Sequence, residues 1–151
     1  MSARIIVSAV CVFAPDGRLL TVRKNGTDRF MHPGGKPEPG ESAAEAASRE
    51  LAEEVGIEVP ARELGLMGFW VARAANEAGT DIEATVFTAP GFHDPAEIHP
   101  AREIAELRWL DVDGELPPDL APLLTDHVIP ALVAQSRRGE ASPTASAQGR
   151  S

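Results

Sequence analysis

The sequence contains a single cysteine, Cys11, among its 151 residues, so no disulfide bond can form within the chain. Cys11 stands in an apolar run rich in β-branched residues, where a cysteine behaves as a small hydrophobic side chain. A catalytic thiol would need a base beside it, and nothing in the sequence indicates one. We therefore predict that Cys11 is buried in the core.

Long hydrophobic runs are also lacking. The longest apolar stretch, residues 5–14, is interrupted by Ser8 and ends at the turn residues 15–17. It is far shorter than the roughly 20 residues of a membrane span. Only Arg4 supplies positive charge before it, and no small-residue cleavage site follows it. We therefore expect no signal peptide, no membrane partner and a cytoplasmic location.

Positive charge is scarce, with 14 Lys and Arg residues against 23 Asp and Glu residues and a formal net charge of -9. The basic residues form no cluster to offset this; Arg137-Arg138 is only a pair. Such a chain repels a nucleic-acid backbone, so DNA and RNA polymers are not expected partners. A small phosphorylated ligand is compatible with this negative net charge if metal ions neutralise the charge of the ligand. The sequence leaves open whether the protein is a monomer or a homodimer.

The length and the 43% hydrophobic content fit one globular domain, residues 1–138, followed by a disordered tail, residues 139–151, that lacks bulky apolar side chains. Apolar patterns and turn residues predict strands at residues 4–14, 19–23, 64–74, 82–89 and 105–111, the first two forming a hairpin. Helices are predicted at residues 42–55 and 118–135, the second kinked or broken at Pro130. This order predicts an α/β fold with a mixed sheet between helices.

The helix at residues 42–55 has the clearest signals. Ser42 followed by Glu45 forms a capping box, and Gly56 is a typical helix stop. A buried stripe is expected from residues at three- and four-residue spacing: Ala44, Ala47, Leu51 and Val55.

Three glutamates on this helix, Glu50, Glu53 and Glu54, share one face. Like charges at this spacing cost about 0.2–0.5 kcal/mol per pair in an isolated helix. A solvated acidic surface is the common explanation for such a cluster. The alternative is a site for a hard divalent cation, because carboxylate oxygens suit Mg²⁺, Mn²⁺ or Ca²⁺.

The loop before the helix favours the second explanation. Residues 33–41 read Pro-Gly-Gly-Lys-Pro-Glu-Pro-Gly-Glu, a rigid segment whose glycines let the backbone approach a ligand closely. Lys36 offers a contact to phosphate. The segment is not a P-loop, because the GxxxxGK[ST] spacing is absent, and no GxGxxG dinucleotide fingerprint is present.

Loop and helix together match the Nudix box, G-x5-E-x7-R-E-U-x-E-E-x-G-U, where U is a bulky aliphatic residue. Gly35 is followed at the required spacing by Glu41, and residues 49–57 read Arg-Glu-Leu-Ala-Glu-Glu-Val-Gly-Ile. Seven fixed residues would coincide by chance at roughly 10⁻⁸ to 10⁻⁹ per start position. The chain thus resembles the Nudix hydrolase family, in particular its MutT-like members.

The resemblance implies an α/β/α sandwich in which the box forms a loop–helix–loop metal site for Mg²⁺, with Mn²⁺ as a substitute. It implies that the metal ligands are Glu50, Glu53, Glu54 and the Gly35 carbonyl. Glu53 and Glu54 would act on the catalytic water, with Arg49 as their orienting partner. Structural support would come from Gly34, Glu41 and Gly56. Which carboxylate acts as the base differs among family members and stays open.

The implied activity is hydrolysis of a phosphoanhydride bond in a nucleoside diphosphate derivative. We expect the substrate to be a nucleoside triphosphate or an oxidised deoxynucleoside triphosphate. Its hydrolysis would give a nucleoside monophosphate and pyrophosphate. ADP-ribose or nucleotide-sugar hydrolysis is the enzymatic alternative. A non-catalytic nucleotide sensor is the other, although such modules often lose box glutamates and none is lost here.

Residues outside the box are predicted less directly. Some relatives supply a further carboxylate before a late strand, and Glu103 is the candidate metal ligand of that kind. Arg23, in preference to Lys24, is predicted to bind phosphate together with Lys36, and Phe30 is predicted to border the base. His32 stands where many relatives carry an apolar residue, and its role is open.

Overall fold

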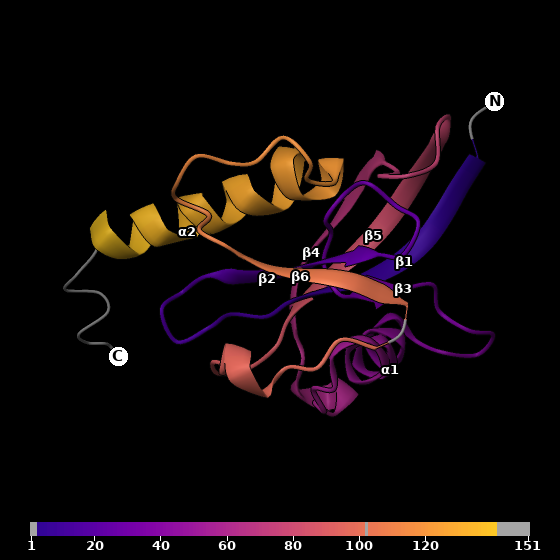
Figure 1. Cartoon of the computed structure of the whole chain (residues 1–151), viewed down its shortest axis with the longest axis horizontal. Helices are drawn as coiled ribbons and strands as arrows, with labels where there is room; N and C mark the ends of the chain where they lie inside the picture. The colour runs from indigo at the N-terminus through magenta and orange to yellow at the C-terminus, as the bar shows by residue number, and fades with distance from the viewer. Residues whose placement is uncertain (1–2, 102, 142–151) are drawn as a thin grey trace.

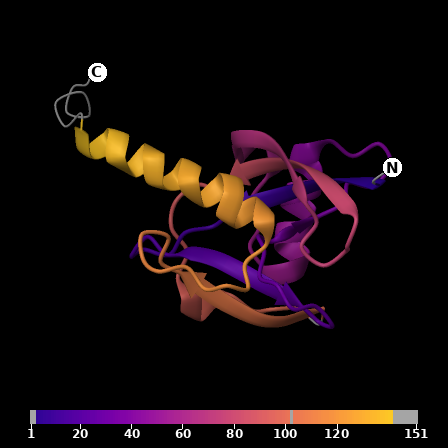
Figure 2. The same ribbon diagram turned by 90° about the horizontal axis from the view of Figure 1, so that it is seen from above.

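The computed structural model describes residues 3–101 and 103–141. The strands form two groups with a helix on either side, as the views in Figures 1 and 2 show. The elements, in chain order, are β1 (Ala3–Cys11), β2 (Leu19–Lys24), β3 (Gly34–Gly35), α1 (Ala43–Val55), η1 (Ala61–Glu63), β4 (Gly65–Arg73), β5 (Thr80–Thr88), η2 (Pro95–Glu97), β6 (Ile104–Leu110), η3 (Leu124–Val128) and α2 (Ile129–Ala141). The predicted α/β fold with a mixed sheet is confirmed.

The larger group has the strand order β3-β1-β5-β4. β1 runs parallel to β5 along its whole length, whereas β3 and β4 pair antiparallel with their neighbours. β2 and β6 form a separate antiparallel pair. The predicted hairpin joins the two groups: the Leu20 N–H donates to the Val12 carbonyl at 2.8 Å just beyond the end of β1.

The two faces of the strands are covered by separate hydrophobic clusters. Leu51 and Val55 of α1 pack against Val10 and Leu20 in one cluster. Cys11 lies in the other, which contains Leu124 and Val128 near the start of α2. Burial raises the pKa of the Cys11 thiol to about 12, and its Sγ lies 3.8 Å from Met67 Sδ. The prediction that Cys11 is buried in the core is confirmed.

The first predicted strand is buried on both faces over only half its length. Residues 8–12 are buried, but Ile6 is 60% exposed. In Figure 1 the N-terminal half of β1 extends beyond α1. The nearly continuous apolar pattern of residues 4–14 suggests burial on both faces, and this expectation is wrong for the N-terminal half of β1.

The last helix starts later than predicted and passes through Pro130 without a break. Residues 118–121 precede it, and Pro122 lies in its first turn. The π-helical turn η3 comes directly before Pro130: the Ile129 N–H donates to the Leu124 carbonyl, five residues back. Proline has no N–H to donate, and a wider turn relieves its contact with the preceding carbonyls.

α2 runs to Ala141, so residues 139–141 of the predicted tail are helical. The remainder of that segment, residues 142–151, lies outside the described residues, and its disorder stays a prediction. Within the described ranges, no helix is both long and apolar enough to cross a membrane.

Candidate active site

The helix α1 is fixed at both ends as its sequence predicts. The Glu45 N–H donates to Ser42 Oγ at 3.1 Å, and the Ser42 N–H donates to the Glu45 carboxylate at 2.9 Å. Gly56 adopts a left-handed conformation with φ of 75° and closes the helix through its N–H to the Ala52 carbonyl. Ser8 of β1 donates its hydroxyl proton to the Ala43 carbonyl at 2.8 Å. The acidic face of α1 is therefore held at a defined position against β1 and β3.

Glu54 is the most buried of the three glutamates, with 2% of its surface exposed. Its Oε1 accepts the Gly34 N–H at 3.1 Å, and its Oε2 lies 3.4 Å from Lys24 Nζ. Burial raises the pKa of Glu54 to about 7; Lys24 and the Gly34 N–H oppose this rise, and the charge of Glu50 adds to it. A carboxyl group in this state can accept or release a proton near neutral pH.

Arg49 connects the loop to the other carboxylates. It donates two hydrogen bonds to Glu41, from Nε at 2.8 Å and from Nη2 at 2.9 Å. It also donates to Glu50 at 3.2 Å, to Glu53 at 3.3 Å and to the Lys36 carbonyl at 3.1 Å. These hydrogen bonds lower the pKa of Glu41 to about 2 and raise the pKa of Arg49. One guanidinium thus orders the loop and two of the three helix glutamates, as the motif predicts for its arginine.

The two glycines of β3 permit close packing around these carboxylates. Gly34 has a φ of 156°, and a Cβ atom there would collide with the Ser8 carbonyl. A Cβ atom on Gly35 would collide with the carboxylate of Glu50. Any side chain at these positions would therefore push β3 away from β1 or Glu50 away from the Gly35 backbone.

The predicted metal ligands have the chemistry that a hard divalent cation needs. Glu50, Glu53, Glu54 and the Gly35 carbonyl offer oxygen atoms only, which are the ligands that Mg²⁺ and Mn²⁺ prefer. In the described part of the chain, no three acidic, histidine or cysteine side chains converge closely enough to hold a metal ion by themselves. Arg49 and Lys24 contact the glutamates instead. Mg²⁺ commonly completes its shell with water and substrate phosphates, which suits such a partial set.

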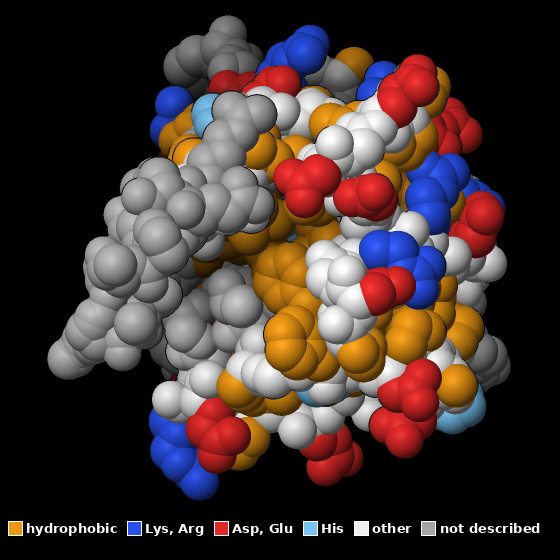
Figure 3. All heavy atoms as spheres, turned by 90° about the vertical axis from the view of Figure 1, so that its left-hand side faces the viewer, with side chains coloured by type: hydrophobic (Ala, Val, Ile, Leu, Met, Phe, Trp, Pro, Cys, Tyr) orange, Lys and Arg blue, Asp and Glu red, His pale blue; other side chains and the backbone are white. Residues whose placement is uncertain are grey.

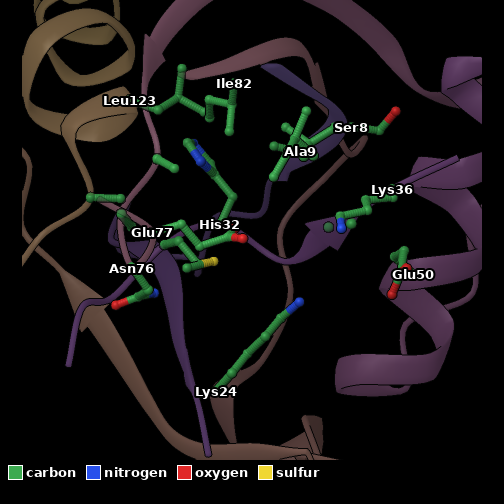
Figure 4. Close-up of a pocket in the computed structure, with 18 of the residues that line it drawn as sticks. Ser8, Ala9, Lys24, His32, Lys36, Glu50, Asn76, Glu77, Ile82 and Leu123 are labelled. Atoms are coloured by element: carbon green, nitrogen blue, oxygen red, sulfur yellow. The ribbon is translucent and has the colours of Figure 1, made fainter. Parts of the chain in front are cut away.

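A cavity of about 610 Å³ opens beside this site. One end is polar and carries Lys24, Lys36 and Glu50, as Figure 4 shows. The other end is formed mainly by apolar side chains of β1, β5 and the segment before α2: Val7, Ala9, Ile82 and Leu123. Its size and its mostly apolar lining are typical of small-molecule sites.

His32 lies between the two ends and is 3% exposed. Its Nε2 has no hydrogen-bond partner among the described residues. Burial lowers the pKa of His32 to about 4, so the imidazole is neutral at pH 7. The sequence could flag this residue only as an unexpected type at its position; its burial against a cavity required the structure.

Two predicted substrate-binding residues do not line the cavity. Arg23 donates to the Thr27 carbonyl at 2.9 Å and pairs with Glu106 at 3.4 Å, and Lys24 takes its place at the cavity. The register of β2 against β6 shifts between these two residues, and such irregularities redirect side chains. Phe30 is 1% exposed, and the Arg108 guanidinium covers its ring at 3.7 Å. These contacts do not support the two assignments, and the roles of Arg23 and Phe30 in substrate binding stay predictions.

Lys36 lines the cavity, and its contact with phosphate stays a prediction, whereas Glu103 does not join the other carboxylates. Its segment packs against the end of α1, since the Ala101 N–H donates to the Glu54 carbonyl at 2.8 Å. The side chain of Glu103 is exposed, and no described contact links it to Glu50, Glu53 or Glu54. Its role as a metal ligand stays a prediction.

Basic side chains are also dispersed on the face of the molecule shown in Figure 3. Lys and Arg residues appear there as separate groups with acidic neighbours, and hydrophobic side chains occupy the centre.

Comparison with known proteins agrees with the fold and the motif. The NUDIX domain profile matches residues 3–132. The CTP pyrophosphohydrolase of Escherichia coli K12 is 30% identical over 124 residues, which cover 79% of this chain and 85% of that protein. The chain therefore belongs to the NUDIX domain family and is a Nudix hydrolase, acting on nucleoside diphosphate derivatives.

Solved structures give the same fold. The MutT protein of Methanosarcina mazei superimposes with a TM-score of 0.67 at 22% identity, covering 91% of this chain and 96% of that one. A NUDIX hydrolase from Nitrosomonas europaea gives a TM-score of 0.55 at 28% identity, covering 73% and 74% of the two chains. The predicted sandwich architecture is confirmed.

Proposed function

We propose that the protein is a Mg²⁺-dependent nucleoside triphosphate pyrophosphohydrolase that releases a nucleoside monophosphate and pyrophosphate. The observation that carries this proposal is that Glu50 of α1 and Gly35 line the polar end of the cavity together with Lys24 and Lys36, and that Lys24 pairs with Glu54. A triphosphate brings several negative charges, and Lys24 and Lys36 supply positive charge where the carboxylates alone would repel it.

The nucleoside triphosphate is preferred over other nucleoside diphosphate derivatives for two reasons. The relative that is 30% identical is named for CTP, a nucleoside triphosphate. The cavity continues from the lysines into a mostly apolar end, so one ligand with a phosphate chain and a base can contact both ends. CTP and dCTP are therefore the first substrates to test, together with oxidised deoxynucleotides.

Bound Mg²⁺ would neutralise phosphate charge and lower the pKa of a water molecule, and the oxygens of Glu50, Glu53, Glu54 and Gly35 would hold it. Lys24 and Lys36 bind phosphate oxygens. Arg49 keeps the loop and the carboxylates in position through its hydrogen bonds.

Glu54 is the proposed acceptor for the proton of the attacking water. It is buried and held in place by the Gly34 N–H and Lys24, whereas the Glu53 side chain is 56% exposed. A fixed carboxylate keeps its oxygen at one position relative to the substrate, which general-base catalysis requires.

The test is hydrolysis in the presence of Mg²⁺ of CTP, dCTP, the other nucleoside triphosphates, 8-oxo-dGTP, ADP-ribose and a nucleotide sugar. ³¹P NMR of the products separates release of pyrophosphate from release of inorganic phosphate. Preference for ADP-ribose or the sugar nucleotide would overturn the proposed substrate class. Binding without turnover of any compound would favour a nucleotide sensor.

The variant Glu54→Gln tests the site itself and should reduce kcat by at least about 100-fold, as loss of a general base does. Glu58→Gln is the matched control, because Glu58 follows α1 and is exposed. It should keep the parental activity. Full activity in Glu54→Gln would remove Glu54 from the mechanism.

A further inference from the structure

The buried Nε2 atom of His32 is unusual for a folded protein. The large majority of buried polar groups have a hydrogen-bond partner, and leaving one without a partner is destabilising. His32 Nε2 has none among the described residues. A leucine or phenylalanine would occupy the position without this cost, so packing alone does not explain a histidine here.

The imidazole points into the apolar end of the cavity. Figure 4 shows the ring of His32 directed toward Ala9, Ile82 and Leu123, away from Lys24 and from Glu50 on α1. The ring therefore faces the end of the cavity that is distant from the proposed metal and phosphate groups. A ligand reaching this end would be the missing partner.

A ligand that fits both ends has a charged phosphate chain and a flat, largely apolar group with polar atoms on its edge. A nucleotide has this form: the base can pack between aliphatic side chains while an edge atom forms a hydrogen bond. Because His32 is neutral, its imidazole has one donor and one acceptor nitrogen, and the tautomer can match either a carbonyl or a ring nitrogen of the base.

We propose that the apolar end of the cavity binds the nucleobase and that His32 selects the base through a hydrogen bond from or to Nε2. This proposal rests on the proposed function for its view of the substrate as a nucleotide. His32 is then a specificity-determining residue, and the residues of the Nudix box act on the phosphates of whichever nucleotide His32 has positioned.

The kinetic test compares His32→Leu with the parent enzyme on CTP and on inorganic tripolyphosphate, which has no base. Loss of a hydrogen bond of about 1.4 kcal/mol corresponds to a tenfold change. We expect KM for CTP to rise about tenfold, with little change in kcat and no change for tripolyphosphate. His32→Gln retains a polar end and should recover part of the loss, whereas the control His99→Leu alters an exposed histidine and should have no effect.

A binding test keeps this inference separate from the proposed function. In the metal-free protein, the imidazole ¹H and ¹⁵N resonances of His32 are assigned by their loss in His32→Leu and followed while cytidine, uridine, adenosine or guanosine is added. A shift with at least one nucleoside supports the inference even if no triphosphate is hydrolysed. Hydrolysis of CTP with unchanged His32 resonances and an unchanged KM in His32→Leu would overturn it.

Discussion

Replacement of Glu54 by glutamine is expected to stabilise the metal-free protein at neutral and alkaline pH while it removes activity. The pKa of this carboxyl is about 7 in the folded protein and 4.5 in its ordinary state. Between these values the folded chain retains a proton that the unfolded chain has released. Folding stability contributed by this group therefore falls as the pH rises from 4.5 to 7, because the buried carboxylate becomes charged.

The size of the effect follows from the same two pKa values. At about 1.4 kcal/mol per pH unit, the interval from 4.5 to 7 corresponds to roughly 3 kcal/mol at pH 8. At pH 5 the destabilisation is expected to be less than about 1 kcal/mol, because Glu54 is mostly protonated in the folded state. Glutamine preserves the acceptor for the Gly34 N–H and never acquires a charge, so it should be free of this penalty.

Urea denaturation in EDTA at pH 5 and pH 8 measures the prediction. The midpoint for Glu54→Gln should exceed that of the parent at pH 8 by the equivalent of about 2–3 kcal/mol and nearly coincide with it at pH 5. Glu58→Gln, which alters an exposed carboxylate, should show no such pH-dependent gain. An equal gain at both pH values, or none at pH 8, would refute the reasoning.

Three further predictions concern neighbouring residues. The pKa of His32 is about 4 in the folded protein and 6.5 ordinarily. In denaturation assays, the free energy of unfolding of His32→Leu relative to the parent should therefore be about 2 kcal/mol higher at pH 5 than at pH 8. Stability from the neutral imidazole is lost as the pH falls from 6.5 to 4, and an identical pH profile in the variant would exclude this. Gly35→Ala should lower kcat at least about 100-fold with an unchanged circular dichroism spectrum, because the added Cβ displaces the carboxylate of Glu50; near-normal turnover would contradict the packing described. Arg49→Lys should weaken Mg²⁺ activation about 10- to 100-fold in a metal titration, since a lysine cannot reproduce the paired hydrogen bonds to Glu41, and an unchanged activation curve would argue against a positioning role.

Local sequence signals predicted the helix that carries the motif almost to the residue. Ser42, Glu45 and Gly56 act within one or two turns of the chain, so the physical interactions that define the helix ends are visible in the sequence. The spacing of Glu50, Glu53 and Glu54 likewise determines their common face. For this reason the proposed metal-binding half of the site could be predicted without a structure.

The half of the site that is proposed to face the base depends on contacts between distant segments. Lys24 lies at the cavity in place of Arg23 because the register shifts between β2 and β6, two strands that are about 80 residues apart in the sequence. The burial of Phe30 under Arg108 and the position of His32 against Ile82 also require the folded arrangement. Neither periodicity nor composition contains this information, because each depends on which side chains meet after folding.

The hydrogen bonds of Arg49 to Glu50 and Glu53 make this guanidinium a counter-ion within the proposed metal site. A divalent ion that enters must compete with this guanidinium, and with Lys24 at Glu54, for the same oxygens. We therefore expect free Mg²⁺ to bind weakly and the complex of Mg²⁺ with a triphosphate to bind well. In that complex, phosphate oxygens coordinate the ion in place of the carboxylate oxygens that are hydrogen-bonded to Arg49. Mg²⁺ and the triphosphate would then bind to the enzyme as one complex. The rate of hydrolysis would follow the concentration of this complex more closely than the concentration of free Mg²⁺.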